Sequence, residues 1–335
     1  MNQVILSDTN RTPIVQIITY FTFVTSLLAF VTHAGIKLYI FRTLRIESWF
    51  VLASLVFCIA QSVAVISQTY HGFGTPMKSL SPQDLLSNFK GEYAAAILLF
   101  ASIGFSKLAI IAFVHSLTPS KRHRVVNFGI GIFAAVWMLC AILIVCFECS
   151  MPDPWNRTQG RCVDRLTWWT AISVLNIVTE VAIVTLELYI TAQLHVKRNR
   201  KASIMGIFAC RLLVTVAAIV QLDFFYQESK DTALKDDLTL GYWRSAICNQ
   251  TMQCLAIFTT CLPYTKIFME GFESGLMRLD DLRRRGEHSS KGDSRSYQLM
   301  DISRSGPDRR AIKVSKTWNI SVEPAAGSSA SHQQT

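Results

Sequence analysis

The chain of 335 residues is 50% hydrophobic and only 17% charged, and its formal net charge is +10. Soluble domains average about 25% charged residues, so this composition excludes an ordinary soluble protein. About a third of the Lys and Arg residues follow position 266, beyond the apolar part of the chain. The positive charge therefore favours orientation at a lipid bilayer, and we expect no nucleic-acid partner.

Seven apolar runs are long enough to cross a hydrocarbon core of about 30 Å, which takes about 20 helical residues. We therefore predict an all-α, polytopic membrane protein. Its transmembrane helices are expected at residues 14–40, 49–70, 92–116, 126–147, 167–194, 204–226 and 243–266.

The predicted membrane domain covers residues 1–285. Apolar residues at helical spacing predict a short helix on the inner membrane surface at about 267–282. Residues 286–335 are rich in Ser, Gly, Arg and Asp and contain few apolar residues. This composition predicts a disordered cytosolic tail.

The loop at 148–166 indicates the orientation of the chain. It carries a glycosylation sequon that begins at Asn156, and it contains Cys149 and Cys162. N-glycans and persistent disulfides both belong outside the cytosol, so we expect this loop and the amino terminus to lie outside. A second sequon, which begins at Asn10, falls on the same side. We therefore predict a multi-pass glycoprotein of the plasma membrane, modified at Asn10 and Asn156.

The connections on the opposite side carry a high density of positive charge. This bias matches the positive-inside rule for cytosolic loops. The residues concerned are Arg42, Arg45, Lys121, Arg122, Arg124, Lys197, Arg198, Arg200 and Lys201.

A disulfide between Cys149 and Cys162 would close a loop of about a dozen residues. Such a bond stabilises a fold by about 3 kcal/mol in the chain-entropy model. Cys146 is an alternative partner for Cys162, and the sequence leaves the choice open. The closed loop would serve either as a structural staple or as a lid that contacts a ligand.

Three ionisable residues fall inside the apolar runs at a similar predicted depth, about 12 Å from the cytosolic edge. They are Lys107, Glu187 and Arg211. A charge inside a bilayer costs at least about 2.5 kcal/mol, so such residues are usually paired. We predict an inner polar lock in which these three side chains pair across the third, fifth and sixth helices. A static ion pair, or a lysine that extends to the interface, is the alternative.

Further polar residues lie nearer the outer side of the bundle. We expect them to line a polar cavity, which a transporter would use for a solute and a receptor for a ligand. Interhelical hydrogen bonding would also explain the amides among them. The candidates are Asn176, Glu180, Asp223, Gln250 and Gln253.

Several short motifs follow one another along the chain: Gly72-Phe73-Gly74, Lys107-Leu108-Ala109-Ile110-Ile111, Cys149 with Trp155 and Cys162, Asn176-Ile177-Val178-Thr179-Glu180, Trp243-Arg244 and Cys261-Leu262-Pro263-Tyr264-Thr265-Lys266. In order and spacing they resemble the fungal rhodopsin-domain integral membrane proteins over about residues 30–285. The resemblance implies seven helices, and the family includes receptor-like members and members from secondary-metabolite clusters. Two positions depart from the family pattern: Glu47-Ser48-Trp49 replaces a frequent acidic pair, and Glu180 replaces a common Asp.

A retinal protein needs a lysine deep in its last helix for the Schiff base. The seventh apolar run has only Lys266, at its inner edge, so we expect no retinal. No catalytic residue set, metal-ligand spacing or cofactor motif is recognisable, and we expect neither an enzyme nor a cofactor.

The sequence thus favours a receptor-like sensor of an extracellular cue. The expected partners are the lipid bilayer, a small extracellular ligand, and a cytosolic signalling partner at the basic loops and tail. The alternative is a small-molecule transporter or a membrane protein of a secondary-metabolite cluster.

Overall fold

The computed structural model describes residues 10–41, 45–118, 120–149, 154–155, 162–193, 198–230, 237 and 239–289. Within these ranges the chain is helical and has no named strand, which confirms the predicted all-α class. Its elements are α1 (Thr12–Ile36), η1 (Lys37–Phe41), α2 (Ile46–Tyr70), η2 (Met77–Ser79), α3 (Pro82–Leu117), α4 (Lys121–Cys146), α5 (Arg165–Ala192), α6 (Arg198–Ala209), α7 (Leu212–Lys230) and α8 (Trp243–Ser289).

Among the described residues, 6 helical segments are long and apolar enough to cross a membrane. They correspond to the first six predicted spans, and α6 and α7 together provide the sixth, Lys201–Lys230. The predicted seventh span is also helical, as the first part of α8. It is more polar than the others because it carries Asn249, Gln250 and Gln253.

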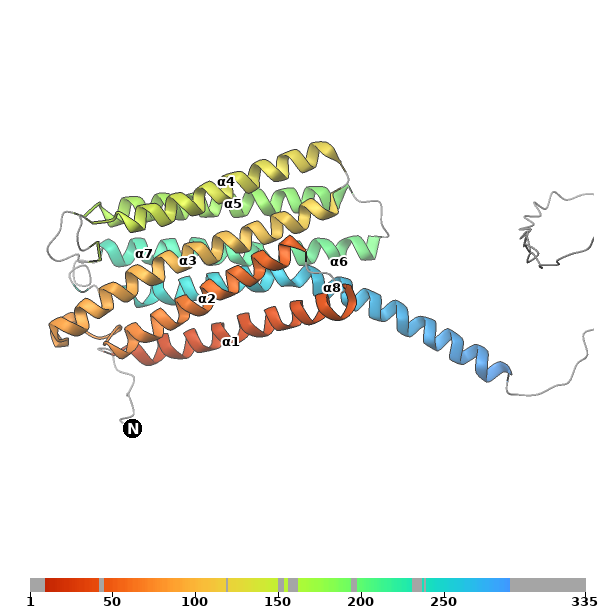
Figure 1. Ribbon diagram of the computed structural model, residues 1–335, viewed down its shortest axis with the longest axis horizontal. Helices are drawn as coiled ribbons and strands as arrows, with labels where there is room; N and C mark the ends of the chain where they lie inside the picture. Colours follow the sequence, from red (N-terminus) through yellow and green to blue (C-terminus); the bar gives the residue numbers. More distant parts are fainter. Residues whose placement is uncertain are drawn as a thin grey trace, which may run out of the picture. The chain divides into compact units, whose positions relative to one another are not determined.

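The helices run up and down in an antiparallel bundle (Figure 1). α2 ends, and α3, α5 and α8 begin, at the end of the bundle that also holds the Cys149–Cys162 disulfide. We call this the disulfide end, and it is the end predicted to face outward. α3 and α5 end at the opposite end, which is predicted to be cytosolic.

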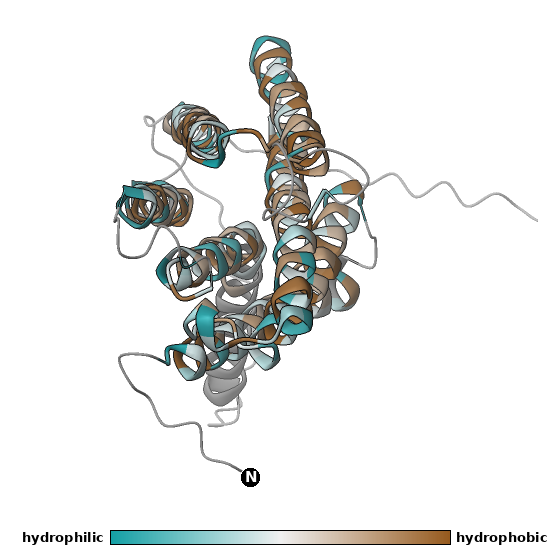
Figure 2. Cartoon of the chain, turned by 90° about the vertical axis from the view of Figure 1, so that its left-hand side faces the viewer, coloured by the Kyte–Doolittle hydropathy of each residue, from teal (hydrophilic) through white to brown (hydrophobic). Residues whose placement is uncertain are grey.

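The bundle exposes apolar side chains and buries polar ones, as expected of helices surrounded by lipid. Figure 2, which looks along the bundle from the disulfide end, shows apolar residues on every helix. Exposed apolar residues include Phe21, Leu28 and Leu139. Buried polar residues include Ser102 and Gln253, both at 0% exposure.

Beyond the seventh span, α8 continues to Ser289 without a break. The stretch predicted as a surface helix is therefore helical, but it is the continuation of the seventh span and not a separate element. The predicted tail begins inside this helix, at position 286. Residues 290–335 lie outside the described residues, so the disorder of the tail stays a prediction.

The turn between α2 and α3 fixes the start of α1. Gly72 and Gly74 have φ angles of 84° and 91°, which lie in the region that favours glycine. The Gly74 carbonyl accepts a hydrogen bond from the Arg11 amide at 2.9 Å. The Thr12 hydroxyl donates to the Phe73 carbonyl at 2.8 Å. The family-like motif Gly72-Phe73-Gly74 thus joins α1 to the α2–α3 turn.

We predict that Gly74→Ala lowers the free energy of unfolding by about 1–3 kcal/mol. The added Cβ would lie 2.8 Å from the Thr12 backbone nitrogen, at a backbone angle that alanine rarely adopts. Thermal unfolding of the purified protein in nanodiscs measures the loss. Gly129→Ala in α4 is the matched control, because nothing lies within 4 Å of a Cβ there. Equal stability of the two variants would refute this account of the turn.

Candidate functional site

Two cations converge on one buried carboxylate in the middle of the bundle. The Nε atom of Arg211 donates to Glu180 at 3.0 Å, and its Nη2 atom does so at 3.4 Å. The Nζ atom of Lys107 lies 3.5 Å from the same carboxylate. Lys107 and Glu180 are both 0% exposed, and Arg211 is 2% exposed. We call these three residues the central ion cluster.

The predicted pairing was therefore right for the two cations and wrong for the acid, which is Glu180 and not Glu187. The error arose from the predicted edges of the spans. α6 begins at Arg198, so Arg211 lies about 20 Å along the sixth span, and Glu180 lies about 18 Å before the end of α5. Glu187 is only about 8 Å from that end, and its carboxylate accepts no hydrogen bond from Arg211.

Further contacts of Lys107 add hydrogen bonds to α5 and reach one more helix, α4. Its ammonium donates to the Asn176 carbonyl at 3.0 Å and to the Thr179 hydroxyl, both on α5. It also lies 4.6 Å from the centroid of the Trp137 ring on α4. One lysine thus connects α3 to both α4 and α5.

Arg211 occupies the break between α6 and α7. Its amide donates to Phe208 at 3.1 Å, an i−3 bond in place of the usual i−4 helical bond. Its Nη1 atom donates to the Thr260 hydroxyl of α8 at 3.1 Å. Thr260 in turn lies 3.0 Å from the Ser106 hydroxyl of α3. The break in the sixth span therefore coincides with the residue that ties it to α5 and α8.

We predict that Glu180→Gln lowers stability by about 3–5 kcal/mol, because it leaves two buried cations without their carboxylate. The double variant Glu180→Gln with Lys107→Met should be more stable than Glu180→Gln alone, since it removes one of them. Chemical denaturation in detergent measures both. Asp223→Asn is the control, because Asp223 is exposed. If the loss of stability in the double variant equals the sum of the losses in the two single variants, Lys107 and Glu180 are not coupled.

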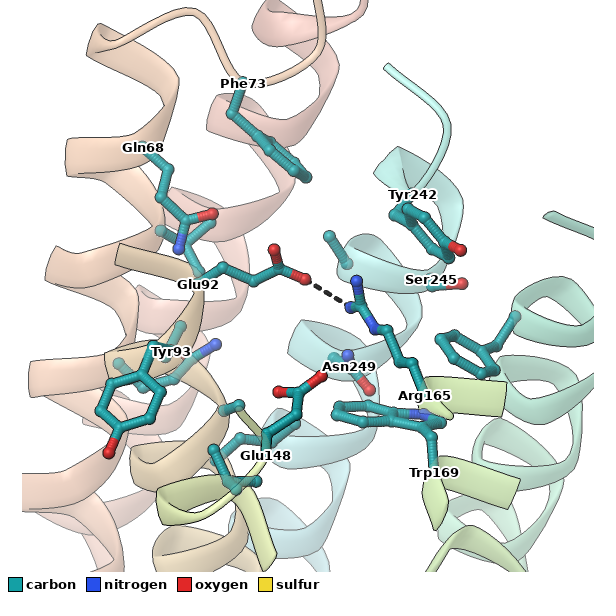
Figure 3. Close-up of a pocket in the computed structure, with 18 of the residues that line it drawn as sticks. Gln68, Phe73, Glu92, Tyr93, Glu148, Arg165, Trp169, Tyr242, Ser245 and Asn249 are labelled. Atoms are coloured by element: carbon teal, nitrogen blue, oxygen red, sulfur yellow. Dashed lines mark hydrogen bonds and ion pairs between the residues drawn. The ribbon is translucent and has the colours of Figure 1, made fainter. Parts of the chain in front are cut away.

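A second group of polar residues surrounds a cavity of about 70 Å³ at the disulfide end (Figure 3). Glu92 of α3 and Arg165 of α5 form an ion pair across it. The Arg165 guanidinium lies 4.6 Å from the Tyr242 ring centroid and 5.6 Å from that of Phe225. The cavity is lined mainly by α2, α3, α5 and α8, together with Glu148, Phe225 and Tyr242.

Several donors and acceptors around this outer cavity have no hydrogen-bond partner among the residues that the structure describes. They are Arg165 Nε and Nη1, Trp168 Nε1, Trp169 Nε1 and Asn249 Oδ1. Unsatisfied polar atoms at a buried site are costly unless a ligand or water meets them. No motif in the sequence singles out Glu92 or Tyr242 as cavity residues. Their convergence depends on the packing of α3, α5 and α8.

The disulfide joins Cys149 to Cys162, which confirms the predicted pair, and Cys146 is a free cysteine at the end of α4. The Val163 amide donates to the Glu148 carbonyl at 2.9 Å beside it. The disulfide thereby holds Glu148, a lining residue of the outer cavity, next to the start of α5.

The glycosylation predictions remain untested. Asn156 lies outside the described residues. Asn10 is half-buried, and its Oδ1 accepts a hydrogen bond from the Thr12 amide at 3.1 Å.

The predicted polar cavity does not form as a unit. Asp223 was wrongly placed in it: its side chain is exposed and accepts a hydrogen bond from Gln227 at 2.7 Å. Asn176 and Glu180 belong to the central ion cluster and its contacts. Gln250 and Gln253 are buried in α8, and neither lines the outer cavity. The neighbouring Asn249 does.

We predict that Cys149→Ser lowers stability by about 3 kcal/mol under oxidising conditions and has no effect after reduction. Cys146→Ser should leave stability unchanged under both conditions, and it provides the matched control. Thermal unfolding with and without reductant measures the difference. A larger effect of Cys146→Ser would show that the native bond uses the other cysteine.

Lipid-facing apolar helices around buried charges define a polytopic membrane protein. Residues 33–271 match the model of the fungal rhodopsin domain, and the chain belongs to this family. It is also similar to a SAT4 family membrane protein of Emericella nidulans, at 24% identity over 216 residues. That match covers 63% of this chain and 54% of the relative, so the chain spans about half the length of that curated protein.

Proposed function

We propose that the protein is a receptor-like sensor that binds a small polar ligand in the outer cavity. The observation that carries this proposal is the set of donors around the Glu92–Arg165 pair that lack a partner in the described part of the chain, at Arg165, Trp168 and Trp169. Donors of this kind suit a ligand with a carboxylate or another acceptor group. The aromatic rings of Trp169, Phe225 and Tyr242 provide the apolar walls, and the volume of about 70 Å³ admits a small polar group rather than a whole drug-sized molecule.

Two ion pairs join the same two helices, and they offer a route for the signal. Glu92 and Lys107 on α3 are 15 residues apart, and so are Arg165 and Glu180 on α5. The outer and central pairs therefore lie about 22 Å apart along both helices. A ligand that engages Arg165 competes with Glu92 for it. The loosened outer contact between α3 and α5 would then shift the conformational equilibrium of the central ion cluster.

In this proposal the output lies at the end opposite the disulfide, where a cytosolic signalling partner binds the basic loops and the tail. The protein acts at the plasma membrane, as a glycoprotein and without catalysis. It also acts without retinal, because Lys266 lies at the end of the seventh span and not deep within it. Basic loops near anionic lipid headgroups support this orientation.

A small-molecule transporter is the second candidate. The observation that favours it is the break between α6 and α7 beside the central ion cluster, since transporters often place binding sites at discontinuous helices. Uptake into proteoliposomes separates the two functions, because a sensor binds its ligand without accumulating it.

We predict that small carboxylate-bearing molecules raise the unfolding temperature of the purified protein, and that Arg165→Gln abolishes the shift for any molecule that binds. The reason is the loss of the charge-assisted hydrogen bonds of Arg165. A thermal-shift screen measures the effect. Lys90→Gln is the matched control, because Lys90 is exposed and does not line the cavity. Ligands that stabilise Arg165→Gln as well as the natural protein would contradict an outer site.

A further inference from the structure

A second cavity, of about 380 Å³, lies at the end of the bundle opposite the disulfide. It opens between α3, α5, α6 and α8. We call it the inner cavity. Its volume lies within the range of about 300–1,000 Å³ that holds small organic ligands. It shares no lining residue with the outer cavity, so binding in the inner cavity does not depend on the proposed sensor site.

The lining residues of the inner cavity are ordered by depth. The helix directions place Phe113 of α3, Glu187 of α5 and Phe208 of α6 nearest the middle of the bundle. The mouth is polar, and a hydrogen bond of 3.1 Å joins His123 to Gln193 there. Between floor and mouth the walls are mostly apolar, with Val114, Leu117, Ile190, Ile204 and Ile207.

Glu187 is the one acidic residue among the described residues that line the inner cavity. It is 2% exposed, and neither of its carboxylate oxygens has a hydrogen-bond partner among the described residues. The nearby Arg211 guanidinium is bound to Glu180 and Thr260 instead. Lys266 lines the cavity from the end of the seventh span, and it has an interaction of its own. A buried carboxylate without donors is costly, and it marks a place where a donor is expected.

We propose that the inner cavity binds a small organic cation with an apolar body. The ammonium group would donate to Glu187 at the floor, and the hydrocarbon part would pack against Phe113, Phe208 and the aliphatic walls. An anionic ligand would meet the carboxylate with the same charge. A neutral apolar ligand would leave Glu187 without a donor. A ligand with an apolar body and a terminal amine matches both the shape of the inner cavity and the charge of Glu187.

The test uses the full chain in nanodiscs and two probes that differ in one group, 4-phenylbutylamine and 4-phenylbutan-1-ol. Calorimetric titration, with empty nanodiscs as the blank, measures both affinities. The natural protein should bind the amine at least tenfold more tightly than the alcohol, because the charge-assisted bond to Glu187 is available only to the amine. In the Glu187→Gln variant, the affinities for the amine and for the alcohol should be about equal.

Two further variants keep the test decisive. Glu228→Gln is the matched control, because it makes the same change in a buried carboxylate that does not line the inner cavity. It should keep the preference for the amine. Ile207→Trp fills the cavity and should abolish the binding of both probes, which identifies the site even if Glu187→Gln fails to fold. Equal affinity for the two probes, or unchanged amine binding in Ile207→Trp, would overturn the proposal.

Discussion

The structure depends on one carboxylate that is shared by two cations. Glu180 is wholly buried in a bundle whose outside is apolar, so the charges of Lys107 and Arg211 have no aqueous alternative. Desolvation makes such charges costly, and only close pairing with additional hydrogen bonds offsets the cost. The carbonyl of Asn176 and the hydroxyls of Thr179 and Thr260 supply those additional bonds.

The central ion cluster also explains an irregularity of the sixth span. A regular helix through Cys210 and Arg211 would carry the usual i−4 hydrogen bonds. The structure has i−3 bonds there instead, from Arg211 to Phe208 and from Leu213 to Cys210. Short 3₁₀ segments within a helix often mark hinges or strain. Here the irregular turn holds the guanidinium that reaches both α5 and α8.

Much of this architecture could be predicted from the sequence because lipid imposes a simple rule. Each spanning segment needs about 20 apolar residues, so six spans stand out by length and composition alone. The Cys149–Cys162 bond was predictable for a similar reason, since one short polar loop holds both cysteines. Lys107 and Arg211 were recognisable because charges are rare inside apolar runs.

The predictions that were wrong concern the packing of the helices, which no local sequence pattern contains. Glu180 and Glu187 are two helical turns apart on one face, so composition alone could not choose between them. The choice followed from the start of α6 at Arg198, six residues before the predicted edge of that span. The prediction that Asp223 lines a polar cavity was wrong for a different reason. It faces away from the neighbouring helices, and a polar residue near a helix end gives no signal of its direction.

The two ion pairs between α3 and α5 limit where the bundle can move. Their polarity is opposite, with the acid on α3 in the outer pair and on α5 in the central pair. Both helices run in the same direction with equal spacing between their charges, so a slide of one past the other would separate both pairs at once. α3 and α5 therefore form a firm frame while both pairs hold. The irregular turn between α6 and α7 is tied to this frame, because Arg211 donates to Glu180 of α5.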